Sequence, residues 1–248
     1  MKLGGYYGTV DTKALTEFLM GRHPKRVRAA KQAWENRTDE SLVDKLSDSL
    51  DPEGQFVKIC LRMFKGPSKG RREMKDAADE AQAVEQCNAI KDAFEAFEES
   101  GEKGGFETVM IETICDNSPP ENKELARIFE DTCDMSLRRA IKKGFDNDAE
   151  DALISLTLGP YDYYAAELKK ALHAEEIDDK AICRIVGSHD KDEIKAIAAS
   201  YEKKYSTDLK GAISGACKGE YRRLAVAWVD LSDQLGQPEK VITIPKEE

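Results

Sequence analysis

The sequence predicts an all-α fold, an array of about three five-helix repeats in which the first copy lacks its opening helix. From Pro160 to Leu235, apolar residues recur every three or four positions in five short blocks, a spacing typical of amphipathic helices. The chain also aligns with itself, which indicates internal repeats. Two overlays place apolar side chains on common positions: Trp34, Phe129 and Tyr201 on one, and Leu46, Ile141 and Ile213 on another.

The first predicted copy spans residues 1–66. Its opening, MKLGGYYGTV, is too rich in glycine for a regular helix, whereas Asp11 can cap a helix that begins at Thr12. Pro24 fits the start of the next helix, and two more helices are expected on either side of Asp51-Pro52. A basic linker at 67–76 follows, which either is solvated or contacts anionic lipid.

The second predicted copy spans 77–159, the third spans 160–236, and 237–248 is a polar tail. In the second copy a long helix ends at Ser100, GEKGG follows as a loop, and the next helix begins at Phe106. Three further helices are expected, at about 121–132, 136–143 and 148–158. Gly159-Pro160 separates the second copy from the third.

Composition excludes several classes of function. The chain of 248 residues has a net charge of −10 with 35% charged residues, so its surface would repel nucleic acid. No apolar run approaches the roughly 20 residues that span a bilayer, and no signal-like segment follows Met1, which predicts a cytoplasmic protein. Six cysteines without a CxxC pair indicate free thiols. Without a nucleophile elbow, Walker loop or GxGxxG motif, the chain is not expected to be an enzyme.

The residues resemble the annexin family. The resemblance rests on the repeat of about 70 residues and on three phrases in the last copy: YDYYAAELKKAL, DDKAICRIV and GEYRRLAVAWVDL. The position of the linker indicates annexin repeats two, three and four, without the first repeat and the opening helix of the second. The diverged loops are more similar to those of the protist annexins called alpha-giardins than to those of animal annexins. The resemblance implies a helical disc that binds Ca²⁺ on one face and, through it, anionic phospholipid.

The family's calcium site joins a glycine-rich loop, KGxGTD, to a carboxylate about 40 residues later. In the first copy, Gly4, Gly8 and the following Thr9 match part of this loop, while Tyr6 replaces a glycine. Asp48 lies 40 residues after Gly8 and is the candidate carboxylate ligand. The alternative is a turn that only caps the next helix.

The other two copies depart further from the calcium pattern. In the second, Gly104 keeps the loop flexible, but Phe106 stands in place of the loop aspartate and Gly144 in place of the distant acid. Asp146 and Asp148 are the candidate substitute ligands. In the third, the loop His173–Ile177 has no glycine and Ala216 stands where the acid should be. Its carboxylates are expected to cap a helix or face solvent.

Two functions follow from the resemblance. The first is calcium-dependent, peripheral binding to anionic phospholipid membranes. The alternative is a degenerate annexin that acts as a cytoskeleton-associated scaffold with little calcium binding. The absence of the first repeat would leave an apolar face on the last copy, which predicts self-association or a partner. Trp34 and Trp228 lie on apolar helical stripes, which favours core positions over lipid-inserting anchors.

Overall fold

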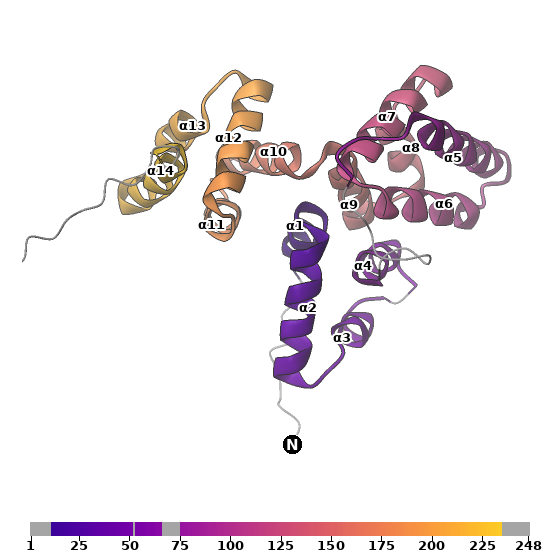
Figure 1. Ribbon diagram of the computed structural model, residues 1–248, viewed down its shortest axis with the longest axis horizontal. Helices are drawn as coiled ribbons and strands as arrows, with labels where there is room; N and C mark the ends of the chain where they lie inside the picture. The colour runs from indigo at the N-terminus through magenta and orange to yellow at the C-terminus, as the bar shows by residue number, and fades with distance from the viewer. Residues whose placement is uncertain (1–10, 52, 66–74, 235–248) are drawn as a thin grey trace, which may run out of the picture. The chain divides into compact units, whose positions relative to one another are not determined.

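The computed structural model describes residues 11–51, 53–65 and 75–234, and all regular structure within these ranges is helical (Figure 1). The helices are α1 Thr12–Gly21, α2 Pro24–Thr38, α3 Leu42–Ser49, α4 Gln55–Lys65, α5 Glu80–Ser100, α6 Lys103–Asp116, α7 Pro119–Cys133, α8 Leu137–Gly144, α9 Asn147–Leu158, α10 Pro160–Leu172, α11 Asp179–Ser188, α12 Lys191–Tyr205, α13 Leu209–Ala216 and α14 Gly219–Gln234. None of these described helices is both long and apolar enough to cross a membrane. The all-α prediction is confirmed.

The helices recur at constant shifts along the chain. A shift of 95 residues carries α2 and α3 onto α7 and α8, and a further shift of 72 carries α7, α8 and the start of α9 onto α12, α13 and the start of α14. We therefore call α1–α4, α5–α9 and α10–α14 the first, second and third copies. This order is consistent with the predicted array of repeats.

The same turn joins the long third helix of the repeat to its short fourth helix in every copy. The residue after the long helix has positive φ, and two residues later a side chain caps the short helix. The positive-φ residues are Asp39, Asp134 and Ser206, and the caps are Ser41, Ser136 and Asp208. Short polar side chains that tolerate a left-handed backbone therefore fix this corner of the repeat.

The chain divides into two compact units, and the first spans Met1–Pro160. In it α1 packs against α9, and α4 packs against both α6 and α9, so the first and second copies share one core. Leu19, Ile59, Ile114 and Leu153, from these four helices, are fully buried there. The hydrophobic effect thus holds two copies together as one folding unit.

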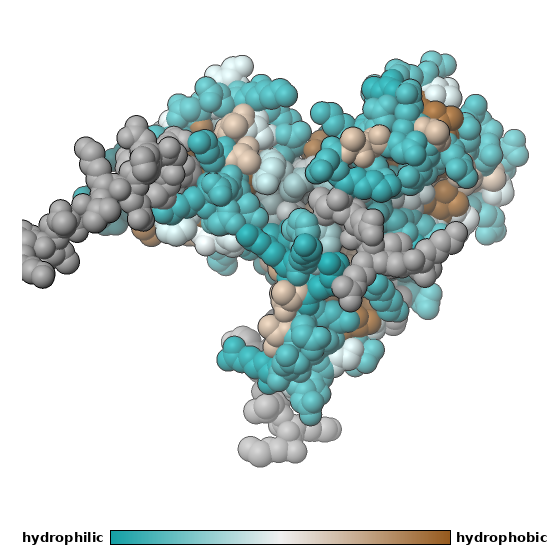
Figure 2. Space-filling model, viewed as in Figure 1, coloured by the Kyte–Doolittle hydropathy of each residue, from teal (hydrophilic) through white to brown (hydrophobic). Residues whose placement is uncertain are grey.

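The second unit, Tyr161–Glu248, contains the third copy. Here α11, α12 and α13 all pack against α14. The core contains large apolar and aromatic side chains from several helices, among them Tyr164, Ile182, Ile194, Tyr201 and Ile213, each at most 2% exposed. Figure 2 shows that hydrophilic residues cover most of the visible face of the described chain, as its charge content requires.

Candidate functional site

Of the six predicted calcium ligands, the structure describes three: Asp48, Gly104 and Asp146. The other three, Gly4, Tyr6 and Gly8, lie outside the described residues. Asp48 is exposed near the end of α3. Its carboxylate makes no hydrogen bond or ion pair with the described part of the chain, so it is accessible to a cation from solvent.

The repeat alignment locates the position of the distant acid in each copy. It is the last residue of the short fourth helix, which is Ser49 in α3, Gly144 in α8 and Ala216 in α13. None of these three side chains can supply the bidentate carboxylate that calcium loops use. Asp48 precedes this position by one residue, so its side chain lies on the same turn of α3, about 100° around the helix axis from that of Ser49.

Gly104 lies within a helix rather than in an open loop. Gly101 ends α5 with a φ of 75°, and α6 begins two residues later at Lys103. The carbonyl oxygen of Gly104 already accepts a hydrogen bond from Thr108 Oγ1 at 2.8 Å. The loop expected at GEKGG is therefore shorter than predicted, because Lys103, Gly104 and Gly105 form the first turn of α6. The backbone N–H groups of a first turn have no acceptor within the helix.

An aromatic ring fills the space of the acid in the second copy. Phe106 is 1% exposed and packs against Phe94, Phe97 and Phe145 with ring centroids 5.3, 5.6 and 6.0 Å away. A Cβ atom built on Gly144 would lie 2.3 Å from Cε1 of Phe106. No side chain fits at residue 144 while this ring is in place, and the local environment is apolar rather than suited to a cation.

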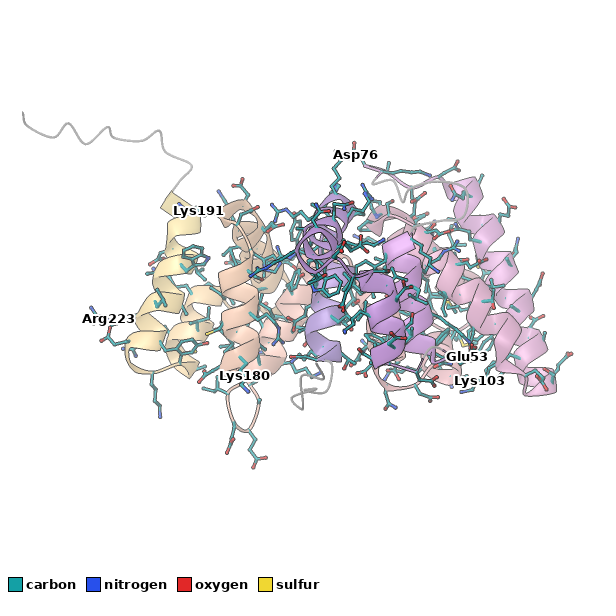
Figure 3. The ribbon with its side chains drawn as sticks, turned by 90° about the horizontal axis from the view of Figure 1, so that it is seen from below. Glu53, Asp76, Lys103, Lys180, Lys191 and Arg223 are labelled. Carbon is teal, nitrogen blue, oxygen red and sulfur yellow. The ribbon has the colours of Figure 1, made fainter. Side chains whose placement is uncertain are left out.

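Gln55 and Lys103 contact the polar atoms around residues 144 and 146 in the second copy. The amide nitrogen of Gln55, at the start of α4, donates to the carbonyl oxygen of Gly144 at 2.9 Å and to Glu107 Oε1 at 2.7 Å. Its amide oxygen accepts from the backbone N–H of Asp146 at 3.2 Å. Lys103 lies 3.5 Å from the carboxylate of Asp146. Figure 3 labels Lys103 and Glu53, both in the first unit.

The loop of the third copy projects from its unit beside Lys180 (Figure 3). Residues 173–176 are exposed, including Glu175 and Glu176. Asp178 uses its carboxylate to cap α11, accepting from the N–H of Ala181 at 3.0 Å. The prediction for this loop is thus confirmed: one carboxylate caps a helix and two face solvent.

Two other kinds of site, a metal cluster and a reactive thiol, have little basis in the described residues. They contain no cluster of three or more His, Cys, Asp or Glu side chains arranged to hold a metal ion. Burial raises the pKa of the Cys60 thiol far above its ordinary value, which keeps it protonated and unreactive.

Known proteins with similar sequences identify the family that this chain resembles. A sequence model of the family described as annexin matches residues 163–228, which lie in the third copy. The resemblance to the annexins is confirmed. Mouse annexin A6 is 26% identical over 221 residues, covering 88% of this chain and 32% of the relative, and human annexin A13 is 24% identical over 220 residues, covering 88% and 66%.

The fold of this annexin-like chain is shared with an alpha-giardin. The calcium-bound structure of alpha-14 giardin aligns with a TM-score of 0.72 at 18% identity, covering 90% of this chain and 71% of that one. At that identity the match establishes the fold alone. The chain spans about a third of annexin A6 and about two thirds of annexin A13.

The sequence carries a signal for the packing of Phe106 against Gly144. Both residues depart from the calcium pattern. A large side chain gained at one position and a side chain lost at another is the signature of one compensated packing change. Gln55 gave no comparable signal, because its partners lie 52 and 89 residues away.

Proposed function

We propose that this annexin-like chain binds anionic phospholipid membranes peripherally and in the cytoplasm, through a calcium ion held in the first copy. The observation that supports the proposal is the state of Asp48, an exposed carboxylate with no hydrogen bond or ion pair in the described part of the chain. The second copy is filled by Phe106, and the third uses Asp178 as a helix cap. Calcium binding is therefore proposed at one site, with Gly4, Tyr6 and Gly8 as the loop partners of Asp48.

Membrane binding through one site would be weak. A single calcium-bridged contact with the lipid headgroups would have to supply the affinity that several sites acting together give. In the second copy, Gly104 and Asp146 would contribute a second, more hydrated site only if calcium displaced Lys103 from the carboxylate of Asp146. Calcium has a higher charge than an ammonium group, but the carbonyl oxygen of Gly104 already accepts a hydrogen bond from Thr108.

The test is co-sedimentation with phosphatidylserine vesicles over a calcium series, with a chelator control. Asp48→Ala is expected to abolish calcium-dependent pelleting. Asp92→Ala is the matched control, since Asp92 is also an exposed aspartate on a helix and also makes no ion pair with the described residues. Loss of pelleting in both variants, or in neither, would show that Asp48 is not the ligand.

A second candidate function is a scaffold associated with the cytoskeleton, with little calcium binding. The observation that favours it is that Ser49, Gly144 and Ala216 occupy the three acid positions. This candidate predicts no pelleting with vesicles even at millimolar calcium. It also predicts co-sedimentation with microtubules or actin filaments in the presence of a chelator, a result that the first candidate does not require.

A further inference from the structure

An apolar groove lies between α11 and α14 in the second unit. Its volume is about 270 Å³. Two large apolar side chains on its α14 side are exposed, Leu224 at 69% and Trp228 at 36%. Exposed apolar surface of this kind on one helical stripe is typical of an interaction site. The principal lining residues are Ile182, Cys183 and Val186 from α11 and Leu224, Ala225 and Trp228 from α14.

The matching residues of the second copy are buried. Moving the six lining residues back by 72 positions gives Met110, Ile111, Ile114, Ala152, Leu153 and Leu156, all of which are at most 6% exposed. The contrast is greatest on the last helix of the repeat, where Ala152 is 0% exposed and its counterpart Leu224 is 69% exposed. The same face of the repeat is therefore covered in one copy and uncovered in the other.

The first copy supplies the cover in the first unit. Helix α1 packs on α9, α4 packs on α6, and α4 also packs on α9. Helix α1 corresponds to the second helix of the five-helix repeat, as α6 does in the second copy. The second repeat helix of each copy therefore contacts the last helix of the other copy, and the two last helices contact each other. This arrangement has the symmetry of a two-fold interface, in which one surface patch pairs with an equivalent patch.

We infer that the α11/α14 face binds the α11/α14 face of a second copy of this chain. The two faces would reproduce the pairing inside the first unit: α11 on the partner's α14, α14 on the partner's α11, and α14 on α14. A two-fold axis closes such a contact at a dimer, so it does not extend into a filament. Trp228 takes the place of the smaller Leu156, and buried tryptophans are frequent energetic centres of interfaces.

Trp228 is a residue at which the structure differs from the sequence-based expectation. Trp228 was predicted as a core residue, whereas it is partly exposed in the chain alone. The apolar stripe was identified correctly, but the helix that covers its counterpart in the first unit has no equivalent among the described helices of the second unit. In the proposed dimer, the partner's α14 takes that role.

The test is sedimentation equilibrium of the full chain over a nanomolar to micromolar concentration series, in a chelator to exclude calcium effects. The wild-type chain is expected to form a dimer. Leu224→Glu should weaken dimerisation by about a hundredfold, because each dimer loses two buried leucines and gains two desolvated charges. Val84→Glu, which changes an apolar residue 43% exposed on α5 in the first unit, is the matched control and should dimerise as the wild type does.

Leu224 is exposed, so its substitution should leave the fold intact, which circular dichroism would verify. A wild-type chain that is monomeric at every concentration would overturn the inference, as would a dimer that Leu224→Glu does not affect. A second readout uses Trp34→Phe, which leaves Trp228 as the remaining tryptophan. Its emission should shift to longer wavelength on dilution. A blue-shifted emission that is independent of concentration would mean that another part of the same chain covers the groove, and would also overturn the inference.

Discussion

At the scale of single residues, Phe106 and Gly144 form a complementary pair. The ring of Phe106 lies where a Cβ atom of residue 144 would be, with 2.3 Å between them. The ring of Phe106 belongs to a cluster of four phenylalanines, where it buries apolar surface that a hydrated cation site would leave in contact with water. Two departures from the calcium pattern thus become one packing solution, in which the ring of Phe106 leaves no room for a side chain at residue 144.

A double-mutant cycle would measure this pairing. Gly144→Ala should destabilise the chain by about 1–3 kcal/mol, because the new methyl group meets the ring. Phe106→Ala should cost about 3–5 kcal/mol through loss of burial and formation of a cavity. The double variant should cost less than the sum by about 1 kcal/mol or more, since the methyl group occupies part of the vacated space. Urea unfolding gives the three free energies, and strict additivity would contradict a shared space.

Glu121 is a second residue whose environment leads to a prediction. Burial opposes its ionisation, but hydrogen bonds from Lys75 at 2.6 Å and from Ser118 prevail and lower the pKa of Glu121 below its ordinary 4.5. The carboxylate therefore stabilises the fold at pH values above 4.5, and this contribution is lost as the pH falls through the lowered pKa of the folded state.

The measurement is the free energy of unfolding from neutral pH down to acid, for the wild type and for Glu121→Gln. The wild type should be more stable at neutral pH, and the difference should shrink as the pH falls through and below the ordinary carboxyl pKa. Glu99→Gln, at an exposed position, controls for the change in net charge. A difference that stays constant with pH would show that the ionised form of Glu121 has no special role.

Residue-scale prediction from sequence succeeded where a role depends on near neighbours. The capping role of Asp178 and the surface position of Glu175 and Glu176 follow from the few residues around them. It could not anticipate that Gly104 lies inside α6, or that the backbone N–H of Asp146 donates to Gln55 of α4. The roles of Gly104 and Asp146 as ligands stay predictions. The assignment of Asp48 with Gly4, Tyr6 and Gly8 stays a prediction.

At the scale of elements, one arginine fixes α4 of the first copy against α6 of the second. Arg62 makes two hydrogen bonds to the carboxylate of Asp116, one of them at 2.8 Å, and a third to Glu112 at 3.2 Å. Its side chain is 18% exposed and that of Asp116 is 26% exposed. A bidentate, partly buried pair is stronger than an exposed one, so it contributes to the orientation of the two helices.

Arg62→Ala should therefore destabilise the first unit by about 1–2 kcal/mol, because Asp116 loses its partner in a half-buried position. Arg127→Ala is the matched control: this arginine makes ion pairs with Glu124 and Asp131 on its own helix and with Glu80 of α5, but it is 52% exposed and should matter little. Thermal unfolding of both variants checks the comparison. Equal effects would mean that the pairing of Arg62 does not couple the helices.

Helix boundaries show what periodicity can and cannot predict. The stripe of apolar residues placed the helix that starts at Phe106, but the structure begins α6 at Lys103. Two glycines carry no apolar signal, so the pattern could not extend the helix through them. They are tolerated in the first turn, and Phe106 is held in place by the long helix α5 through Phe94 and Phe97.

At the scale of the whole molecule, one repeat surface occurs in two environments. In the second copy it is buried against the first copy, and in the third copy it forms the groove between α11 and α14. The sequence predicted the repeat and its apolar faces because they depend on local spacing. It could not predict which face is covered, because that depends on contacts between segments far apart in the chain. Leu19 of α1 and Leu153 of α9, for example, share one core although 134 positions separate them.

The two environments lead to a prediction about local stability. If a second chain covers the α11/α14 face, dimerisation stabilises these helices by mass action, and their backbone amides should exchange with deuterium more slowly as the protein concentration rises. Amides of α6 and α9 lie on the equivalent face that the first copy already covers, so their exchange should not depend on concentration. Hydrogen exchange followed by mass spectrometry compares the two faces in the same sample. In Leu224→Glu the concentration dependence of α11 and α14 should disappear while α6 and α9 stay protected. Equal concentration dependence on both faces would mean that association is general rather than directed by the uncovered face of the third copy.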